Sequence, residues 1–249
     1  MIYDEDLHEI GESSLQLKND IILPGPGLQE IVHRYFVITS EETFRPERCW
    51  YILPDNSAHL IFYLFEQSNT IIPRWMVIGP RSKHTIITRQ NRIFTFICTF
   101  KPGGLKPLTD IPVNELKDLS LDSYDVLRNY QSRTFEQLTL HALRSDIAEF
   151  VKCLEGFLTH SVPSTDRHPV IQGLYEKIGD QLDRSLIKTV AKELGYSDRQ
   201  LRNIIQSNIG HSPKMVQKIE RFAASLRLRK FTGNWASIAH SSGYYDQSQ

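Results

Sequence analysis

The sequence predicts an α+β protein in which a β-rich N-terminal domain precedes an all-α C-terminal domain. Between residues 28 and 100, short apolar runs alternate with turn-forming residues, which is typical of strands in a sandwich or half-barrel. From residue 134 onward, apolar residues recur at steps of three and four, as on one face of a helix. Charge divides the chain too, because residues from His168 onward hold 12 Lys and Arg against 7 Asp and Glu within a chain of zero formal net charge.

The strands of the N-terminal domain follow a polar stretch, residues 1–20, to which no element is assigned. We expect strands within residues 28–38, 50–53, 59–65, 74–78, 84–88 and 93–100. Proline, glycine and asparagine at 54–57, 79–80 and 90–91 predict the turns between them.

A further turn-forming cluster, residues 101–104, ends the strand series. Its proline and paired glycines allow a close backbone approach, which either redirects the chain or shapes the mouth of a pocket. A short helix start is expected at 114–116.

Residues 134–158 carry an apolar stripe at helical spacing. Such a stripe either packs within the domain or forms the seam of a homodimer, and the pattern favours packing without excluding the dimer. The polar residues 159–169 are the best candidate for a linker.

The C-terminal residues predict two helices joined by a tight turn. Val190, Ala191 and Leu194 share one face of the first helix, and Gly195 follows where a left-handed residue ends it. Ser197 can cap the second helix, in which Leu201 lies on the inward face with Ile204 and Ile205. Pro213 suits the first turn of a third helix.

The outward face of the second helix has the chemistry to read base edges, because Arg bonds guanine and Asn or Gln bonds adenine through paired contacts. The residues assigned to DNA contact there are Arg199, Gln200, Arg202, Asn203 and Gln206. Lys214, Lys218 and Arg221 follow as candidate phosphate contacts, and Glu220 is the one acid between residues 199 and 230. Helix pairs of this kind also occur in all-α domains that bind no DNA, and the charge pattern favours DNA binding over that interpretation.

At these residues the sequence resembles the AraC/XylS family of bacterial transcription regulators. The matching motifs are the turn at 195–197, the closure Gly210-His211-Ser212-Pro213, the pair Arg221-Phe222 and a later run at 235–248. The resemblance implies two helix-turn-helix units joined by a long helix, each placing a recognition helix in the major groove. It also implies that the second unit is incomplete in this sequence. Asn203 and Ile205 depart from the basic residue and the Phe that are usual in the family.

Residues 22–125 resemble the N-terminal module of a subgroup of these regulators, through Ile52-Leu53-Pro54-Asp55, Gly79-Pro80 and Phe100-Lys101-Pro102-Gly103-Gly104. Related regulators use a cupin-like β-domain as a sensor, which implies a small-molecule effector here. The candidate ligand-binding residues lie at the turns and among the aromatic positions: Trp50, Asp55, Phe62, Trp75, Phe96 and Gly103.

Neither an enzyme nor a cofactor is expected. The histidines and the three cysteines lack metal-ligand spacing, and no phosphate loop, Gly-x-Ser-x-Gly or His-Glu-x-x-His motif occurs. Three widely separated cysteines favour a reducing compartment, and neither a signal peptide nor a long apolar run is present, so we expect a cytoplasmic protein without a membrane partner.

The sequence thus divides into three parts. Residues 1–125 form a β-rich sensory domain, cupin-like or a sandwich, 126–166 a helical connection, and 167–249 a helix-turn-helix domain with an incomplete second unit. The function expected is sequence-specific binding of double-stranded DNA by a transcription regulator. The alternative is a sensor or oligomerisation protein that binds no specific DNA.

Overall fold

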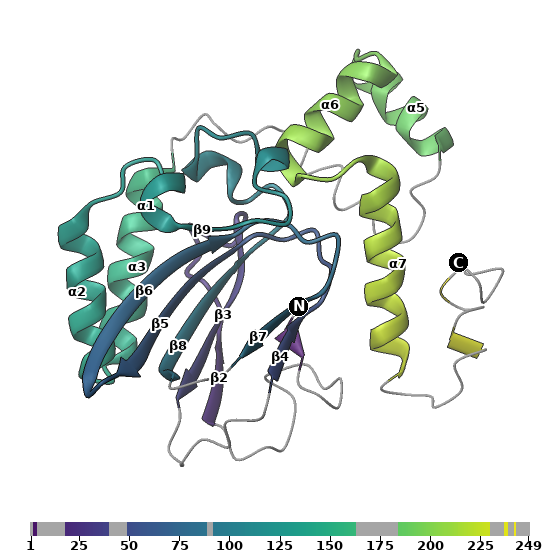
Figure 1. Cartoon of the computed structure of the whole chain (residues 1–249). Coiled ribbons are helices and arrows are strands. Elements are labelled where there is room, and N and C mark those ends of the chain that lie inside the picture. Colours follow the sequence, from purple (N-terminus) through teal and green to yellow (C-terminus); the bar gives the residue numbers. More distant parts are fainter. Residues whose placement is uncertain are drawn as a thin grey trace.

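The computed structural model describes residues 2–3, 18–39, 49–88, 92–162, 184–229, 237–238 and 242 (Figure 1). At its centre is a six-stranded antiparallel sheet in the order β2-β3-β8-β5-β6-β9. These strands are β2 (Lys18–Ile22), β3 (Val32–Thr39), β8 (Arg92–Phe100), β5 (His59–Gln67), β6 (Thr70–Ile78) and β9 (Ser120–Asp122). A smaller sheet has the order β1-β4-β7, with β1 (Ile2–Tyr3), β4 (Cys49–Ile52) and β7 (Thr85–Thr88).

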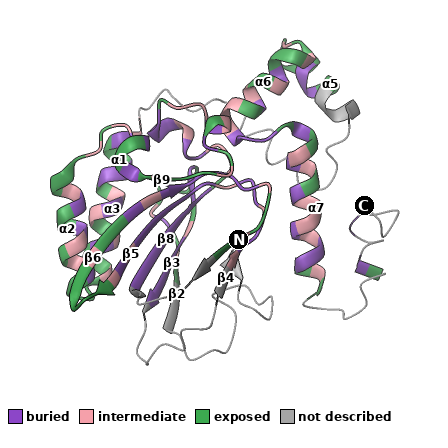
Figure 2. Ribbon diagram, viewed as in Figure 1, coloured by how far each residue is buried: buried purple, intermediate pink, exposed green. Residues whose placement is uncertain are grey.

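Helices cover one face of the large sheet: α1 (Ser123–Val126), α2 (Ser132–Leu143) and α3 (Ile147–Ser161). Leu60, Phe62 and Leu64 alternate along β5 and point into the core that these helices share with the sheet. The side chains between them face the other way, where Ile61 packs in a separate cluster with Ile52 of β4. Both faces of the central strands are therefore buried, as Figure 2 shows.

The chain continues into a helical unit, residues 184–229, which we call the C-terminal helical unit. It contains α5 (Arg184–Glu193), α6 (Asp198–Ile209) and α7 (Pro213–Arg229). Its own core consists of Val190, Ala191, Leu201, Ile205, Ile209 and Val216. An antiparallel sheet region followed by helices confirms the predicted α+β class.

Several predicted boundaries are corrected by local geometry. The strand expected from residue 28 begins at Val32, because Leu28 donates its N–H to the Gly25 carbonyl in a turn. The strand expected at 74–78 begins at Thr70 and contains Pro73, which is tolerated because β9 pairs with β6 only from Met76 to Ile78. The helix start at 114–116 is a 3-10 turn, η2 (Val113–Glu115), and another, η1 (Lys106–Leu108), precedes it.

The apolar stripe at 134–158 packs within the protein. Phe135, Leu138, Phe150 and Leu154 are buried in the same core as the sheet strands, so the segment expected to be a connection lies against the sheet. The part of the predicted linker beyond Val162, the first residues of the predicted helix-turn-helix domain up to 183 and nearly all of its second unit lie outside the described residues.

Candidate nucleic-acid interface

The ends of α6 are fixed by local interactions that the sequence predicts in part. Gly195 has φ 72°, and Gly210, which ends α6, has φ 91°, a left-handed conformation that favours glycine. Ser197 caps α6 by accepting a hydrogen bond from the Gln200 N–H at 3.3 Å, and the Ser197 N–H donates to Gln200 Oε1 at 2.9 Å. This reciprocal pair is a capping box, which satisfies backbone groups that the helix itself leaves unpaired.

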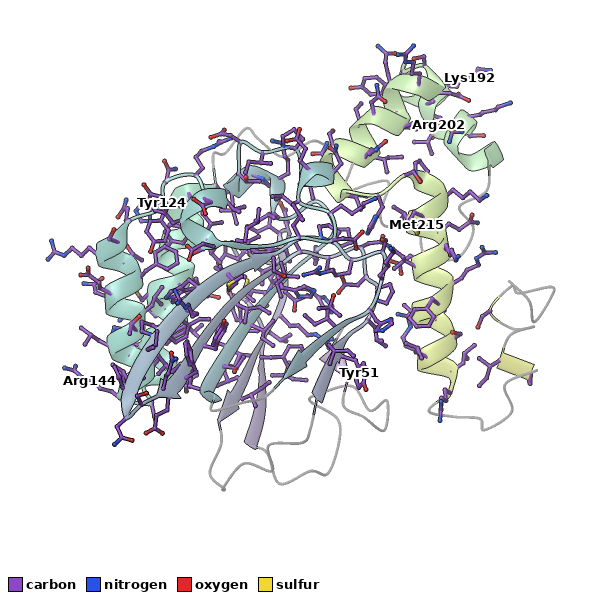
Figure 3. All side chains as sticks on the ribbon, viewed as in Figure 1. Tyr51, Tyr124, Arg144, Lys192, Arg202 and Met215 are labelled. Carbon is purple, nitrogen blue, oxygen red and sulfur yellow. The ribbon has the colours of Figure 1, made fainter. Side chains whose placement is uncertain are left out.

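The predicted reading face of α6 points to solvent. Arg199, Asn203 and Gln206 are exposed and Arg202 is half-buried, whereas Leu201 and Ile205 on the opposite side are fully buried. Figure 3 labels Arg202 on this part of the unit, away from the large sheet. Gln200 is exposed as well, but its side chain is engaged in the capping box and is therefore tied to the helix.

The candidate phosphate contacts lie on α7. Lys214 and Lys218 are exposed, and Arg221 is half-buried. Across residues 184–229 the sequence has 10 Lys and Arg against 3 Asp and Glu, so this unit carries a net positive charge. Exposed cations beside a polar helix face fit the backbone of a nucleic acid.

The candidate ligand-binding aromatics of the sheet lie in its core. Phe62 and Trp75 have ring centroids 4.3 Å apart, and Phe96 lies 4.6 Å from Phe150 of α3. All three side chains are buried against the helices. The backbone of Trp50 lies in β4, but its side chain is outside the described residues.

The two candidate turn residues lie beyond the ends of strands. Gly103, φ 80°, belongs to the turn after β8. Asp55 is buried beside β5, where its carboxylate accepts a hydrogen bond from His59 Nε2 at 2.9 Å and its backbone pairs with Arg81. Both turns lie at the same end of the adjacent strands β5 and β8, because His59 pairs with Thr99 there. Asp55 also lies at the junction with the C-terminal helical unit.

That junction was not predicted from the sequence. The side-chain amide of Asn56 donates to the Val216 carbonyl at 3.2 Å and to the Glu220 carboxylate at 2.8 Å. Next to it, Leu53 packs with Leu226 of α7. The motif at 52–55 drew attention to this turn in the sequence, but it gave no sign that α7 lies against it.

A second turn of the sheet domain approaches the end of α6. A side chain on Gly210 would place its Cβ 3.0 Å from Pro80 and 3.2 Å from the Val113 carbonyl, so glycine allows this close contact. Arg81 holds the neighbouring loop by donating to the Asp118 carbonyl at 2.7 Å and by a hydrogen bond to Ser120. The turns at 54–56 and 79–81 thus both contact the helical unit.

His211 is enclosed at the same junction, with only 2% of its surface exposed. Burial lowers the pKa of His211, although a hydrogen bond with the Asp55 backbone and the negative charge of Asp118 act in the opposite direction. Burial opposes ionisation of Asp118, yet the side-chain and backbone hydrogen bonds from Ser82 lower its pKa below the ordinary value. A neutral imidazole facing an ionised carboxylate is the arrangement that results near neutral pH.

The described residues contain no group of three or more His, Cys, Asp or Glu placed to hold a metal ion. Within the same ranges, no helix combines the length and the apolar character needed to cross a membrane.

Comparison with known proteins gives one match. Residues 20–122 match the family described as Domain of unknown function (DUF6597). No curated protein matches the chain, and no solved structure does. The match begins within β2 and ends at Asp122, the last residue of β9, so it covers the large sheet and the turns at 54–56 and 79–81. The family match therefore falls on the sheet region of this chain.

Proposed function

We propose that the protein is a sequence-specific DNA-binding transcription regulator of the AraC type. In this proposal α5 and α6 form a helix-turn-helix, and α6 enters the major groove. The observation that carries it is the division of α6 into a buried apolar side and an exposed side with Arg199, Asn203 and Gln206. A helix whose apolar side is packed against the protein can present the donors and acceptors of its other side to base edges.

The basic character of the helical unit supports the same function. Lys214 and Lys218 are exposed near the start of α7, where they can neutralise phosphates beside the groove that α6 reads. The resemblance at 195–197, 210–213 and 221–222 to the AraC/XylS family adds support from the order of the motifs.

The sheet domain is the regulatory part in this proposal, responding to a small molecule. The support is the resemblance of residues 22–125 to the N-terminal module of such regulators, and the contacts that join this domain to α7. A signal received by the sheet domain has a physical route to the DNA-binding unit through these contacts.

Selection from a pool of random duplexes by the purified full chain tests the proposal. We expect enrichment of one motif, with affinity that falls steeply as salt is raised. Salt-dependent binding without enrichment of any sequence would contradict it and would favour a sensor or oligomerisation protein without specific DNA binding.

A further inference from the structure

The contact between Asn56 and α7 joins residues that are 164 positions apart in the sequence. Asn56 is 3% exposed, so its amide has exchanged water for the two acceptors of α7. Both side-chain donors of an asparagine belong to one NH₂ group, and here that group bonds the Val216 carbonyl and the Glu220 carboxylate together. Because the two acceptors lie one helical turn apart, the bonds fix where residues 54–56 lie along α7 as well as their distance from this helix.

The contact also engages the one acidic side chain of the basic helix α7. Glu220 is the one acid between residues 199 and 230. A carboxylate near the phosphate backbone would oppose binding, whereas a carboxylate that accepts a hydrogen bond from Asn56 lies toward the sheet domain. The sheet domain thus takes up the group that is least compatible with DNA.

Lys214 and Lys218 of α7 lie on the side away from this contact. Successive residues of an α-helix are rotated by about 100°, so residues two positions apart differ by about 200°. Lys218 lies two positions from both Val216 and Glu220, and Lys214 lies two positions from Val216. Docking at Val216 and Glu220 therefore leaves both lysines exposed, as the structure has them.

We propose that the turn at 54–56 is a clasp by which the sheet domain holds the C-terminal helical unit in an orientation open to DNA, with Asn56 as the positioning residue. Leu53 against Leu226 and Pro80 against Gly210 supply the apolar contacts on either side of it. This inference rests on the proposed function in naming DNA, but the clasp itself is a contact within the chain that is measured without DNA.

Hydrogen exchange of the full chain tests the clasp. Asn56→Ala removes the donor and leaves the half-buried Glu220 carboxylate without it, so we expect exchange of the α7 amides to rise about tenfold or more. Exchange in β5 and β8 should stay unchanged. Glu220→Ala removes the same bond from the other side, and the double variant should add little to either single one. Glu136→Ala, an exposed glutamate of α2, is the matched control.

Two outcomes of the exchange measurement would overturn the clasp. The first is unchanged α7 exchange in both single variants, and the second is full additivity of their effects, which would show that the two residues act separately. If Asn56→Ala raises exchange in β5 and β8 to the same extent, it has destabilised the sheet itself. The effect of Glu220→Ala on α7 exchange then decides whether the clasp exists.

A second measurement tests the open orientation. For a fixed duplex, Asn56→Ala should change the Kd by less than about threefold, because the lysines and the reading face are accessible in the docked state. Binding that becomes tenfold tighter would show that docking covers the DNA-binding face, and would overturn this part of the inference. Absence of DNA binding by the unaltered chain would overturn the proposed function. The exchange measurement would still test the clasp, because it uses no DNA.

Discussion

The ring of Phe150 in α3 stacks on the ring of Trp75 in β6, with an interplanar angle of 6° and centroids 6.0 Å apart. Phe150 also contacts Phe62, Phe94 and Phe96, so one residue of α3 touches the rings of several sheet strands. Because helix and sheet share this aromatic core, α2 and α3 are structurally part of the sheet domain although the DUF6597 match ends before them.

Phe150→Ala should therefore destabilise the sheet domain strongly. Truncation of a buried phenylalanine typically costs about 3–5 kcal/mol, through lost burial and the cavity left behind. Urea unfolding followed by tryptophan fluorescence measures the loss. Leu140→Ala, at an exposed position of α2, should change stability by less than about 0.5 kcal/mol. Equal effects of the two variants would mean that α3 does not belong to this core.

The capping box of α6 should stabilise the helical unit. Ser197→Ala removes the side-chain acceptor and should cost about 0.5–2 kcal/mol. Gln200→Ala removes the other half of the box, and its effect should not add fully to that of Ser197→Ala. Thermal unfolding followed by circular dichroism measures both. Ser207→Ala is the control within the same helix, and a loss there as large as at Ser197 would argue against the cap.

The burial of His211 predicts that the docking of α7 against the sheet domain depends on pH. The groups that face it are Asp55 and Asp118, which raise its pKa, and Lys117, which lowers it together with burial. Because the pKa of docked His211 lies below its ordinary value of 6.5, its contribution to docking is fully present above that pH and is lost as the pH falls below it.

Hydrogen exchange of α7, corrected for the intrinsic effect of pH, follows this change between pH 7.5 and pH 5, about one and a half units below the ordinary value. We expect α7 to lose protection toward the acid end while β5 and β8 keep theirs. In His211→Gln the difference between the two ends should disappear. Loss of protection that persists in this variant would assign the pH dependence to another group.

Residue preferences at helix ends predicted where the helices of the C-terminal unit end. They did not predict the junction between this unit and the sheet domain. Gly195, Ser197 and Gly210 mark the helix ends in the sequence because left-handed backbone and side-chain caps require particular residue types. Asn56 carries no such signal, since an asparagine in a turn is sufficiently explained by its own backbone. Only the fold brings it to Val216 and Glu220.

The aromatic residues show a second limit of the sequence. Phe62, Trp75 and Phe96 have the same pattern whether they line a pocket or fill a core, because both environments select large apolar side chains on one face of a strand. The stripe of α2 and α3 that covers them was visible at 134–158, but its partner could not be chosen from spacing alone. The structure pairs the two sets in one core.

The central claim, that α6 reads base edges, is tested most directly by fluorescence anisotropy of two variants on a selected duplex and on its scrambled form. Arg202→Ala should weaken binding to the selected duplex by about 1–3 kcal/mol and to the scrambled duplex far less, because it removes a base contact. Lys218→Ala should weaken binding to both duplexes equally, because it removes a phosphate contact. Equal losses from both variants on both duplexes would contradict the assignment of the reading face.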